Sequence, residues 1–273
     1  MAKPNATGSE AGLERLLEIM ARLRSDQGCP WDREQTHQSL KPCLIEETYE
    51  VVEAIDSGSP DKLAEELGDL LLQIVFHARL AEEAGQFTIG DVIAGITEKL
   101  IRRHPHVFGD LKVTGVSGVI ENWDRIKKSE KPEERKSVLD GVPKELPALM
   151  QAEKLQTKAA RVGFDWGDLE GPLNKVKEEF AEFEELIRGD EPPAPHSPEW
   201  AKLEDEFGDI LFALVNVGRF MKINPELALI KTNNKFIKRF KYLEKEAAGA
   251  GKDLETMTLA EMDRYWEEAK SKE

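Results

Sequence analysis

Apolar positions recur at three- and four-residue steps along most of the chain, the spacing that places side chains on one face of a helix. Leu13, Leu16, Leu17, Met20 and Leu23 form one such stripe near the N-terminus. Alternating apolar and polar positions, which are typical of strands, are nearly absent. The sequence therefore predicts an all-α fold.

Two stretches, residues 70–76 and 210–217, are apolar on nearly every side. A helix of this kind is buried between several neighbours rather than against one. We therefore expect helical bundles in which these two helices are central. We also expect a second subunit to complete the bundles, so that the protein is a homodimer.

Clusters of turn-forming residues interrupt the helical pattern. They lie at residues 57–60, 131–147 and 189–198. The middle cluster is the best candidate for a linker between domains. The predicted organisation is an N-terminal helical domain over residues 1–132, a linker and connecting helix over 133–163, and a C-terminal domain over 164–273.

A pattern of acidic and basic residues occurs twice along the chain. Its first copy comprises Glu46, Glu47, Glu50, Glu66, Asp69, Lys99 and Arg103, and its second comprises Glu178, Glu179, Glu182, Glu206, Asp209, Lys235 and Arg239. The spacings differ slightly between the copies, and the differences fall in the loops, as expected for duplicated domains. The sequence thus predicts two similar helical-bundle domains that arose by internal duplication.

Charge narrows the possible partners. The 53 acidic and 38 basic residues give a net charge of -15, which disfavours binding to long nucleic acids. No apolar run reaches the roughly 18 residues that cross a bilayer, and the segment 1–10 lacks the apolar core of a signal peptide. We expect a cytoplasmic protein that does not bind membranes.

Each copy of the pattern carries carboxylates that helix geometry brings together. A step of three residues keeps two side chains on one helix face, about one turn apart. A hairpin turning at Gly58 would place Glu47 opposite Asp69, and Glu50 opposite Glu66. An empty cluster of this kind repels itself, whereas a hard divalent cation removes the conflict. Oxygen-only ligands favour magnesium, and no histidine or cysteine is placed to favour zinc.

A single E-x-x-E step is common on any solvated helix and carries little weight by itself. Here the acids come just before the most apolar helices, and the whole pattern appears twice. Both observations favour a functional site over a solvated face. Glu178 and Glu182 also share a face at a four-residue step, so spacing leaves open whether Glu178 or Glu179 is the ligand.

Several motifs together resemble one family. The E-E-x-x-E and E-x-x-D pairs, the L-G-D-L-L run at 67–71, G-C-P-W-D at 28–32 and V-G-F-D-W at 162–166 resemble the MazG-type nucleoside triphosphate pyrophosphohydrolases. The resemblance covers nearly the full chain, in the two-domain form of the family. It implies an all-α homodimer that depends on Mg²⁺, with Mn²⁺ as a substitute. The implied reaction is hydrolysis of nucleoside triphosphates, with broad base preference, to monophosphate and pyrophosphate.

The resemblance also implies roles for individual residues, and it assigns catalysis to the C-terminal domain. The catalytic magnesium ligands would be Glu179, Glu182, Glu206 and Asp209. The substrate-binding set would be Lys175, Glu178, Lys202, Asp205, Lys235, Arg239 and Trp266, with the cations around the triphosphate and the tryptophan near the nucleotide. Such cations are needed, because carboxylates and a triphosphate cannot share one pocket uncompensated.

The first copy departs from this pattern at one position, where Cys43 stands in the place of Lys175. It keeps the acids Glu47, Glu50, Glu66 and Asp69, which would form a second, weaker metal site. A non-catalytic helical scaffold that binds nucleotide or regulates a partner is the alternative function. The complete acidic and cationic set of the second copy favours the enzyme, because a scaffold would not need it.

Overall fold

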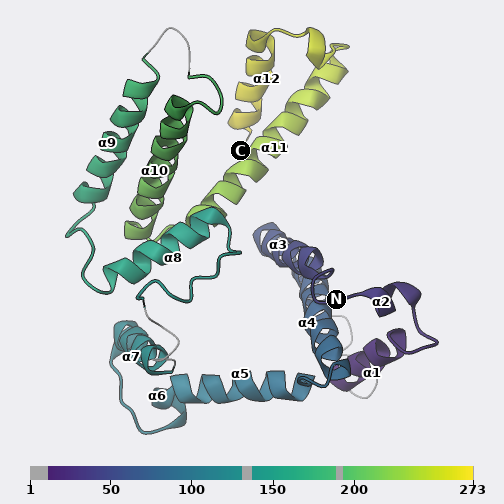
Figure 1. Ribbon diagram of the computed structural model, residues 1–273. Coiled ribbons are helices and arrows are strands. Elements are labelled where there is room, and N and C mark those ends of the chain that lie inside the picture. Colours follow the sequence, from purple (N-terminus) through teal and green to yellow (C-terminus); the bar gives the residue numbers. More distant parts are fainter. Residues whose placement is uncertain (1–11, 131–136, 189–192, 273) are drawn as a thin grey trace. The chain divides into compact units, whose positions relative to one another are not determined.

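The computed structural model describes residues 12–130, 137–188 and 193–272 (Figure 1). These residues form twelve α-helices and one short 3₁₀ helix, with no strand in the described part. The all-α prediction is confirmed. The sequence interpretation of segment 1–10, and parts of the two later breaker clusters, fall outside the described residues. No described helix has both the length and the apolarity that crossing a membrane requires.

The chain separates into two compact units, Met1–Glu130 (unit 1) and Lys131–Glu273 (unit 2). The helices of unit 1 are α1 (Leu13–Leu23), α2 (Pro30–Glu34), α3 (Lys41–Ser57), α4 (Pro60–Glu83), α5 (Ile89–Arg103), α6 (Pro105–Phe108) and α7 (Gly115–Ser129). Those of unit 2 are α8 (Ala148–Ala160), α9 (Glu170–Leu186), α10 (Pro198–Phe220), α11 (Pro225–Gly249), the 3₁₀ helix (Leu254–Thr256) and α12 (Leu259–Ser271).

Local sequence explains the tight turn between α3 and α4. Gly58 ends α3 with a φ of 65°, in the left-handed region that glycine adopts without strain. Ser59 then caps α4 by accepting a hydrogen bond from the backbone N–H of Lys62, and Pro60 occupies the first turn. The two helices consequently pack against each other as a hairpin.

The core of unit 1 forms where α1 and the start of α3 meet α4. Met20, Leu40, Val75 and Phe76 are each at most 3% exposed and pack together. Burying a side chain of this size contributes about 1.5–3 kcal/mol to stability. Phe76 therefore acts as a structural residue at the centre of this unit.

Unit 2 repeats the hairpin with a longer connection. Helices α9 and α10 lie side by side, and α8 contacts α10 (Figure 1). Ser197 caps α10 by accepting from the backbone N–H of Trp200, as Ser59 does in α4. Helices α11 and α12 pack as a second pair.

The two strongly apolar stretches are only partly buried within the chain. On α4, Val75 and Phe76 face the core, whereas Leu71 and Ile74 are 40% and 42% exposed. On α10, the exposed large apolar residues are Phe207, Leu211, Phe212 and Leu214. Each helix thus has one buried apolar face and one that the described chain leaves open to solvent.

Candidate active site

Three carboxylates meet between α9 and α10 in unit 2. Glu179 on α9 and the pair Glu206 and Asp209 on α10 each offer an oxygen, and these oxygens lie within 4.8 Å of one another. Glu179 is 5% exposed, so the cluster reaches into the helix interface. The three-residue step on α10 and the packing of the two helices produce this convergence.

The charges of the cluster act on one another. Burial raises the pKa of the Glu206 carboxyl, and the neighbouring charges of Glu182, Glu179 and Asp209 raise it further. The Oε2 atom of Glu206 is buried and has no hydrogen-bond partner within the described part of the chain. Three of the four acids expected as ligands therefore form the cluster, and Glu182 acts on it through its charge without belonging to the group of oxygens that lie within 4.8 Å.

Lys175 partly neutralises the cluster from one turn earlier on α9. Its Nζ lies 2.5 Å from Glu179 Oε1 and donates to Glu178 Oε1 at 2.7 Å. Hydrogen bonds to these two carboxylates raise the pKa of Lys175, which stays protonated. Glu178 is exposed, whereas Glu179 lies in the cluster. The geometry thus places Glu179 and not Glu178 in the cluster, a choice that helical spacing alone left open.

A cavity of about 390 Å³ adjoins the cluster. Lys175, Glu179 and Asp209 line it together with apolar groups such as Trp166 and Phe212. The volume lies within the range of small-molecule sites, and such sites are largely apolar with a few placed polar groups. The cavity can therefore hold the organic part of a ligand whose charged part reaches the carboxylates.

The remaining residues expected to bind the substrate lie on α10, α11 and α12. Lys202 and Asp205 are exposed on α10, and Lys235 is exposed on α11. The Arg239 guanidinium lies over the Trp266 ring, 5.7 Å from its centroid, and Phe236 packs against the same ring. Arg239 and Trp266 thus form a group on the α11–α12 pair.

Sequence reasoning missed polar residues of the cavity wall. Gln156 on α8 and Asn216 and Arg219 on α10 all line the cavity. Asn216 did carry a signal, because it is a polar residue inside the apolar stretch 210–217. Gln156 carried none, since an isolated glutamine on an amphipathic helix resembles any surface residue.

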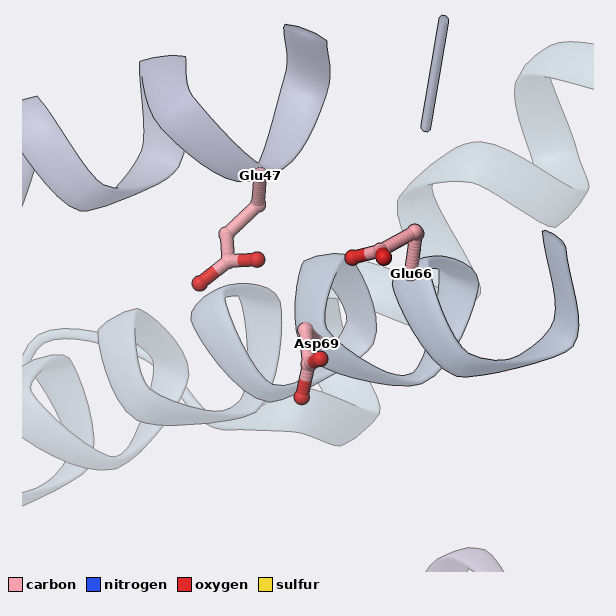
Figure 2. A group of neighbouring side chains, drawn as sticks. All are labelled: Glu47, Glu66 and Asp69. Atoms are coloured by element: carbon pink, nitrogen blue, oxygen red, sulfur yellow. The ribbon is translucent and has the colours of Figure 1, made fainter. Parts of the chain in front are cut away.

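Unit 1 contains a matching carboxylate cluster. Glu47 on α3 points toward the neighbouring helix that carries Glu66 and Asp69 (Figure 2), and oxygens of all three lie within 4.8 Å. Burial and the charges of Asp69 and Glu50 raise the pKa of Glu47. Burial, followed by the charge of Glu50, likewise raises the pKa of Glu66. The predicted first-copy acids therefore also act on one another.

Both clusters fit a divalent cation. Their donors are carboxylate oxygens alone, and neither contains histidine or cysteine among the described residues. Burial and neighbouring carboxylates raise the pKa of Glu206 in unit 2 and of Glu47 and Glu66 in unit 1, and the buried Oε2 of Glu206 has no hydrogen-bond partner among the described residues. A hard cation such as Mg²⁺ or Ca²⁺ binds oxygen ligands and would offset the repulsion among these carboxylates.

Comparisons with known proteins identify the family of this chain. Residues 35–108 match the MazG nucleotide pyrophosphohydrolase domain. The chain is 48% identical over 263 residues to the nucleoside triphosphate pyrophosphohydrolase/pyrophosphatase MazG of Thermotoga maritima, covering 96% of this chain and 97% of the relative. It is 44% identical to a nucleoside triphosphate pyrophosphohydrolase of Escherichia coli K12, covering 96% and 98%. The chain belongs to the MazG family.

A solved structure is also similar to part of the chain. The crystal structure of a mazG-related protein from Thermotoga maritima is 32% identical, with a TM-score of 0.37. The match covers 42% of this chain and 99% of that one.

We predict that Glu206→Gln stabilises the metal-free protein at neutral pH. The pKa of Glu206 is raised in the folded state, so its contribution to stability is complete below the unfolded value near 4.5 and is lost as pH rises through the folded value. The gain should therefore be present at pH 7 and disappear at acidic pH. Thermal unfolding in EDTA across this pH range measures it.

The matched control for this change is Glu184→Gln, at an exposed position of α9. It removes the same charge outside the cluster, so we expect no stabilisation. A lower unfolding temperature for Glu206→Gln at pH 7 would show that repulsion among the clustered carboxylates does not limit the stability of the protein.

Proposed function

We propose that this chain is a Mg²⁺-dependent nucleoside triphosphate pyrophosphohydrolase and that unit 2 carries out the reaction. The observation that carries the proposal is the carboxylate cluster that adjoins a cavity of about 390 Å³ in unit 2. Family membership and the activities for which the Thermotoga and Escherichia relatives are named support the reaction type. Nucleoside triphosphates of different bases are the proposed substrates.

The chain's own residues have separate tasks in this mechanism. Glu179, Glu206 and Asp209 would hold the ion, and Glu182, whose charge acts on Glu206, would complete the ligand set. When bound, the ion would neutralise phosphate charge and activate water. Lys175 would turn from Glu179 toward the phosphates, because Lys175 already lines the cavity.

The reaction breaks the bond between the α phosphorus and the oxygen that bridges to the β phosphate. The oxygen of one water molecule joins the α phosphorus, and pyrophosphate leaves with the bridging oxygen. Lys202, Lys235 and Arg239 would add positive charge around the departing pyrophosphate, which lowers the barrier when the charges are placed in advance. Trp266 would contact the nucleotide from α12.

We also infer that the two units are related domains. The α3–α4 and α9–α10 hairpins carry the same acidic steps and the same Ser-Pro start of the second helix. Helices α1 and α8 each pack on that second helix. The proposed domains span residues 1–132 and 164–273, with α8 in the connecting segment 133–163.

A second copy of the chain is the proposed partner. Leu67, Leu71 and Ile74 form an exposed stripe on α4, and Phe207, Leu211 and Leu214 form the corresponding stripe on α10. Each stripe follows the i, i+4, i+7 spacing of a helix-packing face. Contiguous exposed apolar surface of this kind marks an interface, and its repetition in both units favours pairing between identical chains.

The first prediction from this function concerns products and metal. Incubation with ATP and Mg²⁺ should yield AMP and pyrophosphate in equal amounts. EDTA should abolish turnover, because without the ion the carboxylates repel the negatively charged triphosphate. Anion-exchange chromatography separates the nucleotides. Formation of ADP and phosphate would place the cleavage at a different bond. Binding of ATP without turnover would favour the scaffold.

The second prediction concerns the division of labour between the units. Glu206→Gln or Asp209→Asn should reduce kcat by more than about 100-fold, because each weakens an ion ligand. The matched changes Glu66→Gln and Asp69→Asn should leave most activity, since Cys43 replaces the Lys175 cation in unit 1. Equal losses in both sets, with the assembly intact by light scattering, would mean that both units catalyse.

The third prediction concerns the dimer. Light scattering should give about twice the chain mass of 30.8 kDa. Leu211→Glu, which places a charge in the exposed stripe of α10, should shift the mass toward one chain. Lys177→Glu, at an exposed position of α9, is the control and should leave the dimer intact. A wild-type protein that is monomeric at micromolar concentration would refute the pairing.

A further inference from the structure

Exposed lysines form a row on one face of α11, the long helix that pairs with α12 (Figure 1). They recur at steps of four, three, three and four residues, which keep side chains on one helix face. At the rise of an α-helix the row is about 21 Å long. Its members, which we call the α11 lysine row, are Lys231, Lys235, Lys238, Lys241 and Lys245.

The charges of the α11 lysine row are not neutralised by ion pairs. None of its lysines pairs with a carboxylate among the residues that the structure describes. Other helical lysines of unit 2 do, since Lys175 pairs with Glu178, and Lys270 with Glu267. Like charges three or four residues apart destabilise a helix. The row therefore lowers the stability of α11, and a ligand of opposite charge would offset that cost.

The row also makes α11 positive within a negative chain. The helix carries six basic and three acidic residues, whereas the net charge of the chain is -15. The chain as a whole repels a polyphosphate, but a local positive surface attracts it. Exposed charges act over about 10 Å at 0.1 M salt, so lysines beyond direct contact with a small anion still attract it.

The aligned positions of unit 1 do not form such a row. The alignment that matches Arg103 with Arg239 keeps basic residues at only two of these positions, Lys99 and Arg102. The other three positions carry glycine or proline. Arg102 is also neutralised, because its Nη2 lies 2.9 Å from Glu130 Oε1. The first copy thus lacks the uncompensated positive charge that the second copy has at these positions.

We propose that the α11 lysine row is a capture surface for polyphosphate groups, which attracts nucleoside triphosphates and directs them along α11 toward Arg239. This proposal rests on the proposed function, because Lys235 of the row and the adjacent Arg239 are two of the cations proposed around the departing pyrophosphate. The row raises the local concentration of a substrate that the rest of the chain repels.

A triple variant tests the capture surface. It combines Lys231→Gln, Lys238→Gln and Lys245→Gln, and it leaves Lys235 and Arg239 in place. Glutamine removes the charge and has nearly the helix propensity of lysine, so α11 should form as before. We call this protein the row variant.

The matched control combines Lys144→Gln, Lys154→Gln and Lys177→Gln. These lysines are exposed at scattered positions of unit 2. The control and the row variant change the net charge by the same amount. Any difference between them therefore reports where the charge lies and not how much there is.

The first measurement is calorimetric binding of inorganic tripolyphosphate to the full chain in EDTA. Without a metal ion the carboxylates between α9 and α10 repel this anion, so the assay reports on the basic surface. At low ionic strength the association constant of the row variant should be about tenfold below that of the wild type and the control. In about 1 M salt, where the Debye length is about 3 Å, the difference should disappear.

The second measurement is turnover of ATP with Mg²⁺. At low ionic strength the row variant should have a KM about tenfold above the wild-type value and an unchanged kcat. The row acts on the approach and binding of the triphosphate and not on bond cleavage, which is why the effect should fall on KM. The control should match the wild type in both constants.

Wild-type affinity for tripolyphosphate in the row variant, or an equal loss in the control, would overturn the capture surface. Binding of single-stranded oligothymidylate more tightly than tripolyphosphate, lost in the row variant, would also overturn it and make nucleic acid the partner. A wild-type protein that binds tripolyphosphate through the row but releases no monophosphate from ATP would instead refute the proposed function and leave the capture surface in place.

Discussion

The packing of like charges between α9 and α10 is the constraint on which the rest of unit 2 depends. Apolar contacts along the hairpin hold Glu179, Glu206 and Asp209 within 4.8 Å, although their charges repel. Folding thus holds these acids close together, whereas in the unfolded chain water solvates them separately. Lys175 offsets part of the repulsion, and a bound cation would offset more. The stability of the helices therefore maintains a concentration of negative charge between α9 and α10.

Helix geometry made much of this arrangement predictable. Spacing along a helix fixes which residues share a face, so the acidic steps predicted the clusters in which Glu47, Glu66 and Asp69, and their counterparts in unit 2, now lie. Capping residues likewise predicted the α3–α4 turn at Gly58. These features depend on residues close in sequence, for which propensity and periodicity are informative.

The cavity could not be predicted in the same way, because it depends on the distance between helices that are remote in sequence. Gln156 on α8 reaches the backbone of Phe212 on α10, and no local pattern specifies that contact. The prediction that stretch 210–217 is buried between several neighbours was correct for one face only. Helices α8, α9 and α11 contact α10, and the other face of α10 is exposed within the described chain. Periodicity gives the direction of a side chain, while packing decides what it meets.

The different lengths of the two hairpin connections have a further consequence. In unit 1 only Gly58 and Ser59 separate α3 from α4, so the turn itself fixes the register of the acids. In unit 2, α9 ends at Leu186 and α10 begins at Pro198, and the register is set by helix packing instead. Because closing a longer loop costs little extra entropy, that connection accommodates new chain termini or an inserted domain. The second hairpin is therefore the natural place at which to split the protein into complementing fragments that reassemble its site.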